Sequence, residues 1–305
     1  MADRSERIWL DGALVPWNEA TVSVMTHTLH YGLGAFEGIR CYKCDDGRSA
    51  VFRLDAHIRR LFDTCHIFRL KIPYTPAQVV EACKETIRAN RLQACYIRPI
   101  VFIGDGVMGV HPGTNPVRLA IAVWSWGAYL GEEGLSRGIR CKISSYTRPF
   151  VNSNMTKAKA NGNYINSILA KMEAKDLAYD EAILLDTEGY VAEGSGENIY
   201  IVRDGRIKTP PLTAILPGIT RDSIMRIAAD LRIPLEEQRF TRDELYIADE
   251  AFFTGTAAEV TPIREVDGRT IGAGARGPIT KRIQDAFFDV VNGRAKAYAD
   301  WLSYL

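Results

Sequence analysis

Two lysines, Lys157 and Lys159, precede a predicted helix in the middle of the chain. Apolar residues at helical spacing indicate this helix: Ile165, Ile168, Leu169 and Met172. A lysine that is desolvated or close to other cations loses its proton more readily, so it can attack a carbonyl carbon and form a Schiff base. Most lysines are solvated surface charges instead. The two lysines alone therefore leave both interpretations open.

Two other stretches are suited to binding an anion. Residues 216–220 read LPGIT, a glycine-containing turn that leads into a helix, with Thr220 as the expected N-cap. The free N–H groups and the positive end of such a helix attract an anion, although an ordinary capped helix has the same pattern. Residues 255–259 read GTAAE, a turn of small residues that can present N–H groups to an anion.

Glycines and aromatic residues alternate in the segment 26–42. Gly32, Gly34 and Gly38 permit close approach of the backbone, and Tyr31 and Phe36 could line an apolar pocket. A strand that is interrupted by glycines, with ordinary core aromatics, explains the same pattern equally well.

The composition excludes several classes of protein. The chain has 305 residues, of which 47% are hydrophobic, enough for two domains with separate cores. The net charge of +1 gives no electrostatic reason to expect a nucleic acid or a membrane as partner. The N-terminus lacks the apolar core of a signal peptide, and no apolar run is long enough to span a bilayer. We therefore expect a cytoplasmic protein.

The six cysteines are scattered through the chain, which suits reduced thiols better than a disulfide framework. Cys41 and Cys44 form one C-x-x-C pair, but no second pair or histidine cluster completes a zinc site. We predict no metal site.

The elements of the N-terminal half are indicated by turn and capping residues. Asp11-Gly12 predicts a hairpin over residues 7–17. Asp55 is the expected N-cap of one helix, and a capping box at Thr75 with Gln78 opens a second helix that runs to about Asn90. Strands are predicted at 96–103 and 117–126, separated by a loop at 104–116.

The second half begins after a glycine-rich stretch at 127–138, which we interpret as the interdomain linker. Helices are expected from the lysine segment to about Leu177, from the predicted N-cap Thr220, and from a capping box at Thr241. The C-terminal segments 278–291 and 294–302 also read as helical. Strands are predicted at 139–145, 181–186, 190–193, 197–202 and 251–254.

Strands and helices are mixed, with hairpins throughout, which indicates an α+β fold in two domains. The predicted division is a small N-terminal domain at 1–127, a linker at 128–137 and a larger C-terminal domain at 138–305. The sequence lacks G-x-G-x-x-G after a strand and G-x-x-x-x-G-K-[ST], so dinucleotide and P-loop sites are unsupported.

Several motifs, in order, resemble those of the branched-chain amino-acid aminotransferases, pyridoxal-phosphate enzymes of fold type IV in aminotransferase class IV. The resemblance extends from Trp9 to about Phe288. The motifs are YGLGAFEGIR (31–40), HIRRL (57–61), YIRP (96–99), KANGNY (159–164), EGSGEN (193–198), LPGITRD (216–222) and GTAAE (255–259). The resemblance implies the fold shared with D-amino-acid aminotransferases, with pyridoxal 5'-phosphate in the cleft between two domains.

The resemblance also implies roles for cofactor-binding residues. Lys159 corresponds to the catalytic Schiff-base lysine, which then transfers the proton as general acid and base. Glu193 would keep the ring nitrogen protonated, and Tyr164 would hydrogen-bond the ring oxygen. The residues implied for the phosphate are Arg59, Ile219, Thr220 and Thr256.

For the substrate, the resemblance places the α-carboxylate on the turn of Thr256 and Ala257, with help from Tyr96. Arg98 would face the γ-carboxylate of glutamate, and Arg40 either supports it or forms a surface ion pair. The pocket residues implied are Tyr31, Phe36, Gly38, Tyr129 and Tyr164, with Met108 and Val110 reaching in from a second subunit.

The function implied is reversible transamination between a branched-chain L-amino acid (leucine, isoleucine or valine) and 2-oxoglutarate. It gives the branched 2-oxo acid and L-glutamate. A homodimer is the minimum assembly implied, and a hexamer is compatible with it. D-amino-acid transaminases, (R)-amine transaminases and aminodeoxychorismate lyases share the fold, and a non-catalytic binding protein is the alternative from another class.

Overall fold

The computed structural model describes residues 5–127 and 130–305. By contacts between residues the chain divides into two compact units. Unit 1 consists of Met1–Trp126, Ala158–Asn163 and Val290–Leu305, and unit 2 of Gly127–Lys157 and Tyr164–Asp289. The predicted domain boundaries at 127 and 138 stay a prediction.

Unit 1 contains an antiparallel sheet whose strands follow the order β17-β5-β4-β6-β7-β1-β2, and β3 pairs with β6 beside this path. Its last strand comes from the end of the chain and pairs with β5, a pairing that the sequence did not indicate. The strands are β1 (Arg7–Leu10), β2 (Ala13–Pro16), β3 (Gly34–Phe36), β4 (Ile39–Lys43), β5 (Ser49–Phe52), β6 (Cys95–Ile103), β7 (Val117–Trp124) and β17 (Leu302–Tyr304).

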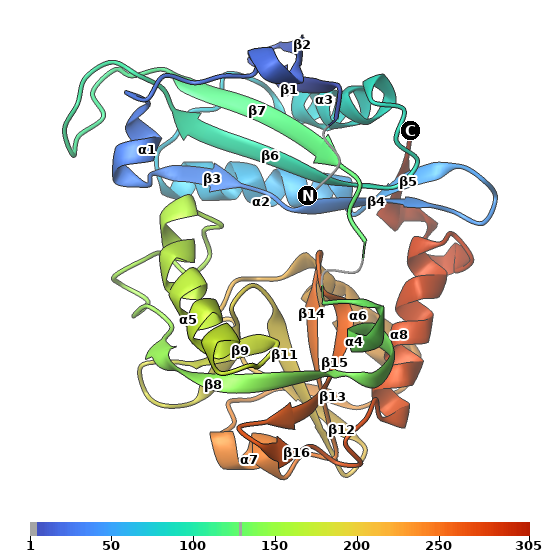
Figure 1. Cartoon of the computed structure of the whole chain (residues 1–305). Helices are drawn as coiled ribbons and strands as arrows, with labels where there is room; N and C mark the ends of the chain where they lie inside the picture. The colour runs from blue at the N-terminus through green and yellow to red at the C-terminus, as the bar shows by residue number, and fades with distance from the viewer. Residues whose placement is uncertain (1–4, 128–129) are drawn as a thin grey trace. The chain divides into compact units, whose positions relative to one another are not determined.

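Helices α2 (Leu54–Ile67) and α3 (Pro76–Ala89) pack on each other and against the sheet of unit 1 (Figure 1). The capping box at Thr75 is confirmed, because Gln78 N donates to Thr75 Oγ1 at 3.3 Å and Thr75 N donates to Gln78 Oε1 at 2.8 Å. The prediction that Asp55 caps α2 is wrong. Arg53 is the N-cap, and Asp55 lies in the first turn, where an acidic side chain also favours the helix.

The remaining helical turns of unit 1 are short: η1 (Trp17–Glu19), α1 (His27–Tyr31), η2 (Asn161–Asn163) and η3 (Lys296–Trp301). The expected helix over 294–302 is therefore only partly correct. Tyr298 has a non-helical backbone inside η3, and Leu302 already belongs to β17. Residues from the strands, α2 and α3 form the core of unit 1, among them Leu54, Ile58, Ile87, Ile97 and Ile121.

The sheet of unit 2 closes on itself. Its strands follow the order β10-β9-β8-β15-β14-β11-β12-β13, and β10 also pairs with β11, so β10, β9, β8, β15, β14 and β11 form a ring. The pair Glu193↔Asn198 makes this closure. The strands are β8 (Ile139–Thr147), β9 (Glu181–Leu185), β10 (Val191–Gly194), β11 (Asn198–Arg203), β12 (Arg206–Thr209), β13 (Leu235–Glu237), β14 (Glu250–Gly255), β15 (Glu259–Val266) and β16 (Arg269–Thr270).

The described part of unit 2 also contains helices α4 (Glu132–Arg137), α5 (Tyr164–Asp176), α6 (Ile219–Asp230), α7 (Arg242–Tyr246) and most of α8 (Pro278–Val291). Since β8 and β9 are parallel, α5 is the crossover between them and packs on both (Figure 1). The stretch interpreted as the interdomain linker contains the short helix α4, which its sequence did not indicate, and its role as a linker stays a prediction. Two of its glycines, Gly131 and Gly138, are the N-cap and C-cap of this helix.

The predicted apolar stripe of α5 does not face the sheet. Small residues face β8 and β9 instead: Ser167, Ala170 and Ala174 are buried. Ile165, Ile168 and Met172 are between 55% and 63% exposed. None of the described helices has the length and apolar character needed to cross a membrane.

Candidate active site

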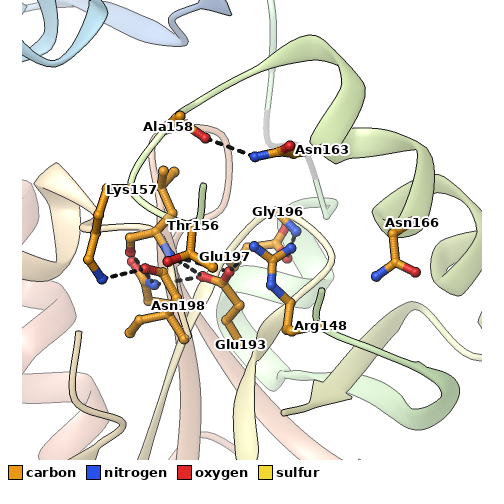
Figure 2. Close-up of polar contacts among 12 residues, drawn as sticks. Arg148, Thr156, Lys157, Ala158, Asn163, Asn166, Glu193, Gly196, Glu197 and Asn198 are labelled. Atoms are coloured by element: carbon orange, nitrogen blue, oxygen red, sulfur yellow. Dashed lines mark hydrogen bonds and ion pairs between the residues drawn. The ribbon is translucent and has the colours of Figure 1, made fainter. Parts of the chain in front are cut away.

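Lys159 lies in a segment whose backbone is bound on both sides within unit 1. Lys159 N donates to Thr64 Oγ1 of α2 at 3.1 Å, and Phe36 N of β3 donates to Lys159 O at 3.1 Å. Asn163 Nδ2 closes the segment by donating to Ala158 O at 3.2 Å (Figure 2). The Lys159 ammonium lies 4.8 Å from the centre of the Phe36 ring. The backbone of Lys159 is therefore fixed, and its ammonium lies beside Phe36.

Glu193 is buried at the closing pair of the unit 2 ring. Arg148 Nη2 lies 3.0 Å from Glu193 Oε1, and Asn198 Nδ2 donates to Glu193 Oε2 at 3.0 Å (Figure 2). Leu216 N also donates to Glu193 Oε2, at 3.3 Å. A cation and two N–H donors stabilise the ionised carboxylate here.

Helix α6 begins beside this carboxylate. Gly218 is its N-cap and Ile219 its first residue, so the prediction of Thr220 as N-cap is wrong by two positions. A Cβ on Gly218 would stand 2.0 Å from Asn198 Oδ1, and this close packing explains why glycine starts the helix. The N–H groups of the first turn, including those of Ile219 and Thr220, have no acceptor within the helix. They form a site suited to an anion.

The turn between β14 and β15 contains Thr256 and Ala257, both half-buried. It packs beside the turn between β10 and β11, because a Cβ on Gly255 would lie 3.5 Å from Gly196 O. Unit 2 thus brings together Glu193, the start of α6 and this small-residue turn. Tyr164, the first residue of α5, is half-buried.

In unit 1, an aromatic wall surrounds Arg98. Its guanidinium carbon lies 4.7 Å from the Phe36 ring centre, 5.3 Å from that of Tyr96 and 5.8 Å from that of Trp124. Arg98 Nη2 donates to Tyr96 Oη at 3.2 Å, while the buried Nε has no hydrogen-bond partner among the described residues. The Tyr96 hydroxyl also packs against Gly38, where a Cβ would lie only 1.9 Å from it.

The other predicted substrate residues lie in or near unit 1. Arg40 Nη2 donates to Trp126 O at 3.0 Å. Tyr31 is 45% exposed, and Val110, in the loop between β6 and β7, is 87% exposed. Met108 is half-buried in the same loop. Tyr129 lies outside the described residues.

Arg59 belongs to unit 1, on α2. Its side chain is 85% exposed and lies 4.0 Å from Asp63, so this ion pair contributes little and the guanidinium is accessible.

Glu37, in the turn between β3 and β4, forms a buried ionic cluster with His57 and Arg60 of α2. His57 Nδ1 lies 2.7 Å from Glu37 Oε2, and Arg60 Nε donates to Glu37 Oε1 at 2.6 Å. Burial alone raises the pKa of Glu37, but Arg60 and His57 outweigh it and bring the pKa well below its ordinary value. Burial, reinforced by Arg60 and Lys159, lowers the pKa of His57 against the opposing effect of Glu37.

Sequence reasoning missed two partners of Glu193. Arg148 follows β8 in a stretch without a motif, and nothing in its neighbours distinguishes it from a surface arginine. Asn198 ends the motif EGSGEN, yet its role depends on the pairing of β10 with β11. A signal for that strand pairing could have identified Asn198, whereas Arg148 meets Glu193 only through the fold.

Glu197 lies one residue before Asn198 and is fully buried near other charged groups. Glu181 and Glu193 face it, as does Lys171, which pairs with Glu181, and Gly196 N donates to Glu197 Oε2 at 3.1 Å. Burial, reinforced by Glu181, raises the pKa of Glu197 to about 8. The folded state therefore holds a proton on this cluster that the unfolded chain releases near the ordinary value of 4.5.

This proton predicts how stability depends on pH. Because the folded pKa is raised, the stabilisation is complete below pH 4.5 and is lost as pH rises through about 8. Glu197→Gln should remove this dependence and raise stability at pH 8.5 by roughly 2 kcal/mol relative to wild type. Urea unfolding at pH 5.5, 7 and 8.5 checks this, with exposed Glu236→Gln as control. Parallel curves for wild type and Glu197→Gln would contradict it.

Comparisons with known proteins agree with this geometry. The family model described as amino-transferase class IV matches residues 34–266. A branched-chain-amino-acid aminotransferase of Pseudomonas aeruginosa is 58% identical over 99% of this chain and 98% of its own length. The enzyme of the same name from Escherichia coli K12 is 47% identical over 98% of this chain and 97% of its own length.

Solved structures give the same result. The T.th. branched-chain amino acid aminotransferase with pyridoxamine 5'-phosphate superposes with a TM-score of 0.96 and 48% identity, covering 99% of both chains. The Escherichia coli structure superposes with a TM-score of 0.96 and 46% identity over 98% of this chain and 99% of that one.

The chain belongs to the class-IV aminotransferases, and its fold is of type IV. Within this family it groups with the branched-chain aminotransferases, and the resemblance seen in its motifs is confirmed.

Proposed function

We propose that the chain transfers the amino group of leucine, isoleucine or valine to 2-oxoglutarate, with pyridoxal 5'-phosphate as cofactor. The products are the branched-chain 2-oxo acid and L-glutamate. Two relatives named branched-chain-amino-acid aminotransferase, which are 47% and 58% identical over nearly the whole chain, support this reaction. The single observation that carries the substrate pair is Arg98, a cation among aromatic rings.

The residues present fit the cofactor. Glu193 is a buried carboxylate that is already neutralised by Arg148 at 3.0 Å, so it can meet a protonated ring nitrogen without leaving an isolated charge. The start of α6 suits a phosphate, and Gly218 leaves no space there for a side chain. When bound, pyridoxal phosphate withdraws electrons from the substrate Cα and makes its proton removable.

Each residue then has a defined task. Lys159 Nζ would hold the cofactor covalently and would carry the proton as general base and acid. Glu193 would hold the proton on the ring nitrogen, and the Tyr164 hydroxyl would donate to the ring oxygen. The groups proposed for the phosphate are the Arg59 guanidinium, the N–H groups of Ile219 and Thr220, and Thr256.

The substrate side has to accept both an aliphatic and an acidic side chain. Phe36, Gly38, Tyr31 and Tyr164 supply apolar contact for the aliphatic chain, and Arg98 supplies the charge for the γ-carboxylate. The rings of Phe36 and Tyr96 contact the Arg98 guanidinium. Because these contacts stabilise the cation, it can remain in an apolar environment when leucine is bound. The α-carboxylate is assigned to the turn of Thr256 and Ala257, with Tyr96.

Arg98→Met tests this division of roles. The variant should raise the KM for L-glutamate and 2-oxoglutarate by roughly 10- to 100-fold, because a hydrogen-bonded charge pair is lost. The L-leucine half-reaction should change less than about threefold. Single-turnover absorption changes measure each half-reaction separately. Arg118→Met is a matched control, because Arg118 also lies over an aromatic ring, Phe102, but pairs with Asp11. Equal loss with both substrates would contradict the proposal.

The same absorption assay separates the other activities known on this fold. Wild type should respond to L-leucine and recover with 2-oxoglutarate. A response only to D-alanine or to (R)-1-phenylethylamine would assign a D-amino-acid or (R)-amine transaminase. Elimination from aminodeoxychorismate without transamination would assign the lyase, and no bound cofactor would leave a binding protein.

A homodimer, with Met108 and Val110 entering the partner's site, is the proposed minimum assembly. Exposed apolar side chains support it: Val24, Leu29 and Val110 in unit 1, and Ile165, Ile168 and Met172 in unit 2. Sedimentation velocity at micromolar concentration checks it, and a monomeric boundary would contradict it. The hexamer and the cytoplasmic location stay predictions.

A further inference from the structure

Lys157, two residues before the proposed catalytic lysine, is engaged within unit 2. Its ammonium donates to Leu212 O, and it lies 3.4 Å from Thr213 O and 3.4 Å from Ile215 O. An ammonium has three N–H donors and no acceptor, so these carbonyls can use all of them. Lys157 is thus committed to the backbone of one segment and is not placed to act as a nucleophile.

That segment leads from β12 to α6, and its far end contacts the candidate site. Leu216 N donates to Glu193 Oε2 at 3.3 Å, and Leu216 O accepts from Asn198 Nδ2 at 3.1 Å. Gly218 packs against Asn198, and α6 begins at the next residue. The position of residues 212–218 therefore sets both a hydrogen bond to Glu193 and the location of the α6 N–H groups.

Carbonyl groups that converge on one point repel each other unless a donor or cation lies between them. Thr156 Oγ1 also donates to Thr213 O, at 3.1 Å, so two consecutive residues bind this segment. Burial, with a contribution from Arg221, lowers the pKa of Lys157, and Glu193 opposes this effect. The Lys157 ammonium is therefore close enough to Glu193 for their charges to interact.

We propose that Lys157 is a positioning residue that holds residues 212–218 so that Glu193 and the start of α6 act on the same cofactor. This inference rests on the proposed function, because it concerns the groups assigned there to the ring nitrogen and the phosphate. Its effect is on cofactor retention: without the ammonium, the carbonyls separate, Leu216 moves from Glu193 and the α6 N–H groups lose their alignment.

The test is the rate at which the holoenzyme releases pyridoxal phosphate into an excess of a trapping amine. Lys157→Met should release it about ten times faster or more. Lys157→Arg, whose guanidinium can still donate to carbonyl oxygens, should stay within about threefold of wild type. Lys175→Met, an exposed lysine on α5, is the control and should be unchanged.

A second readout is local and independent of activity. Hydrogen exchange of the holoenzyme should become faster in the peptide that covers 212–220 of Lys157→Met, and not in the peptide that covers α7. If the methionine variant does not fold, Lys157→Gln replaces it, because this side chain keeps part of the stem and two of the three N–H donors. It should show the same changes, but smaller ones.

The outcomes distinguish this inference from the proposed function. Wild type that retains no pyridoxal phosphate would overturn the proposed function itself. Wild-type retention combined with unchanged release and exchange in Lys157→Met would overturn only the role of Lys157. Equal losses in the methionine and arginine variants would also overturn it, because they would indicate packing at this position and not donation to the carbonyls.

Discussion

Replacing Lys159 with alanine is expected to abolish transamination, lowering kcat by about 10⁴-fold or more. The residue supplies both the covalent attachment and the proton transfer, and its ammonium lies beside the Phe36 ring in unit 1. The backbone contacts of Lys159 with Thr64 and Phe36 do not use its side chain. Folding should therefore be retained, with an unfolding midpoint within a few degrees of wild type.

The informative control is the neighbouring lysine. Lys157→Met should still form product, at a rate reduced less than about tenfold when the cofactor is saturating, since its ammonium binds the carbonyls at 212–215. Steady-state rates with L-leucine and 2-oxoglutarate, together with the visible absorption of each variant, make the comparison. Wild-type turnover by Lys159→Ala, or complete loss in Lys157→Met alone, would reverse the assignment.

The sequence predicted those parts of the fold that depend on local chemistry. The hairpin at Asp11-Gly12 and the capping box at Thr75 rest on short-range backbone preferences, and both are present. Helix starts were less accurate, because tertiary contacts decide them: the Asn198 side chain fills the space at Gly218 and moves the start of α6 to Ile219. The pairing of β17 with β5 joins distant parts of the chain and leaves no local signal. The pair Glu193↔Asn198 is local, but that it closes a ring depends on the order of the other strands in the sheet.

The residues of the candidate site were also predicted only in part. Its motif residues were implied by the resemblance to the family, whereas Arg148 was not, since an arginine becomes a buried partner only through the fold. The apolar residues at helical spacing predicted helix α5 correctly, but they do not form its buried face. Ala170 and Ala174 allow close packing on the strands, and Ile165, Ile168 and Met172 are left exposed.

Glu193→Gln is expected to lower kcat by about 10²- to 10³-fold, because a neutral amide cannot hold the ring nitrogen in its protonated form. The same change should reduce the stability of the fold. One amide oxygen can still accept from Arg148, but the new NH₂ group faces Asn198 Nδ2 and Leu216 N, which are also donors. A buried cation that has lost its counter-charge costs about 3 kcal/mol.

The double variant Glu193→Gln/Arg148→Met separates these two effects. Removing the cation should recover most of the lost stability, because no buried charge then remains unpaired, while kcat stays as low as in the single variant. Urea unfolding of the cofactor-free proteins and single-turnover rates with L-leucine give the two quantities. If restoring stability also restored turnover, Glu193 would act by closing the strand ring with Asn198 and not through its charge. If neither variant lost turnover, the carboxylate would have no part in the chemistry.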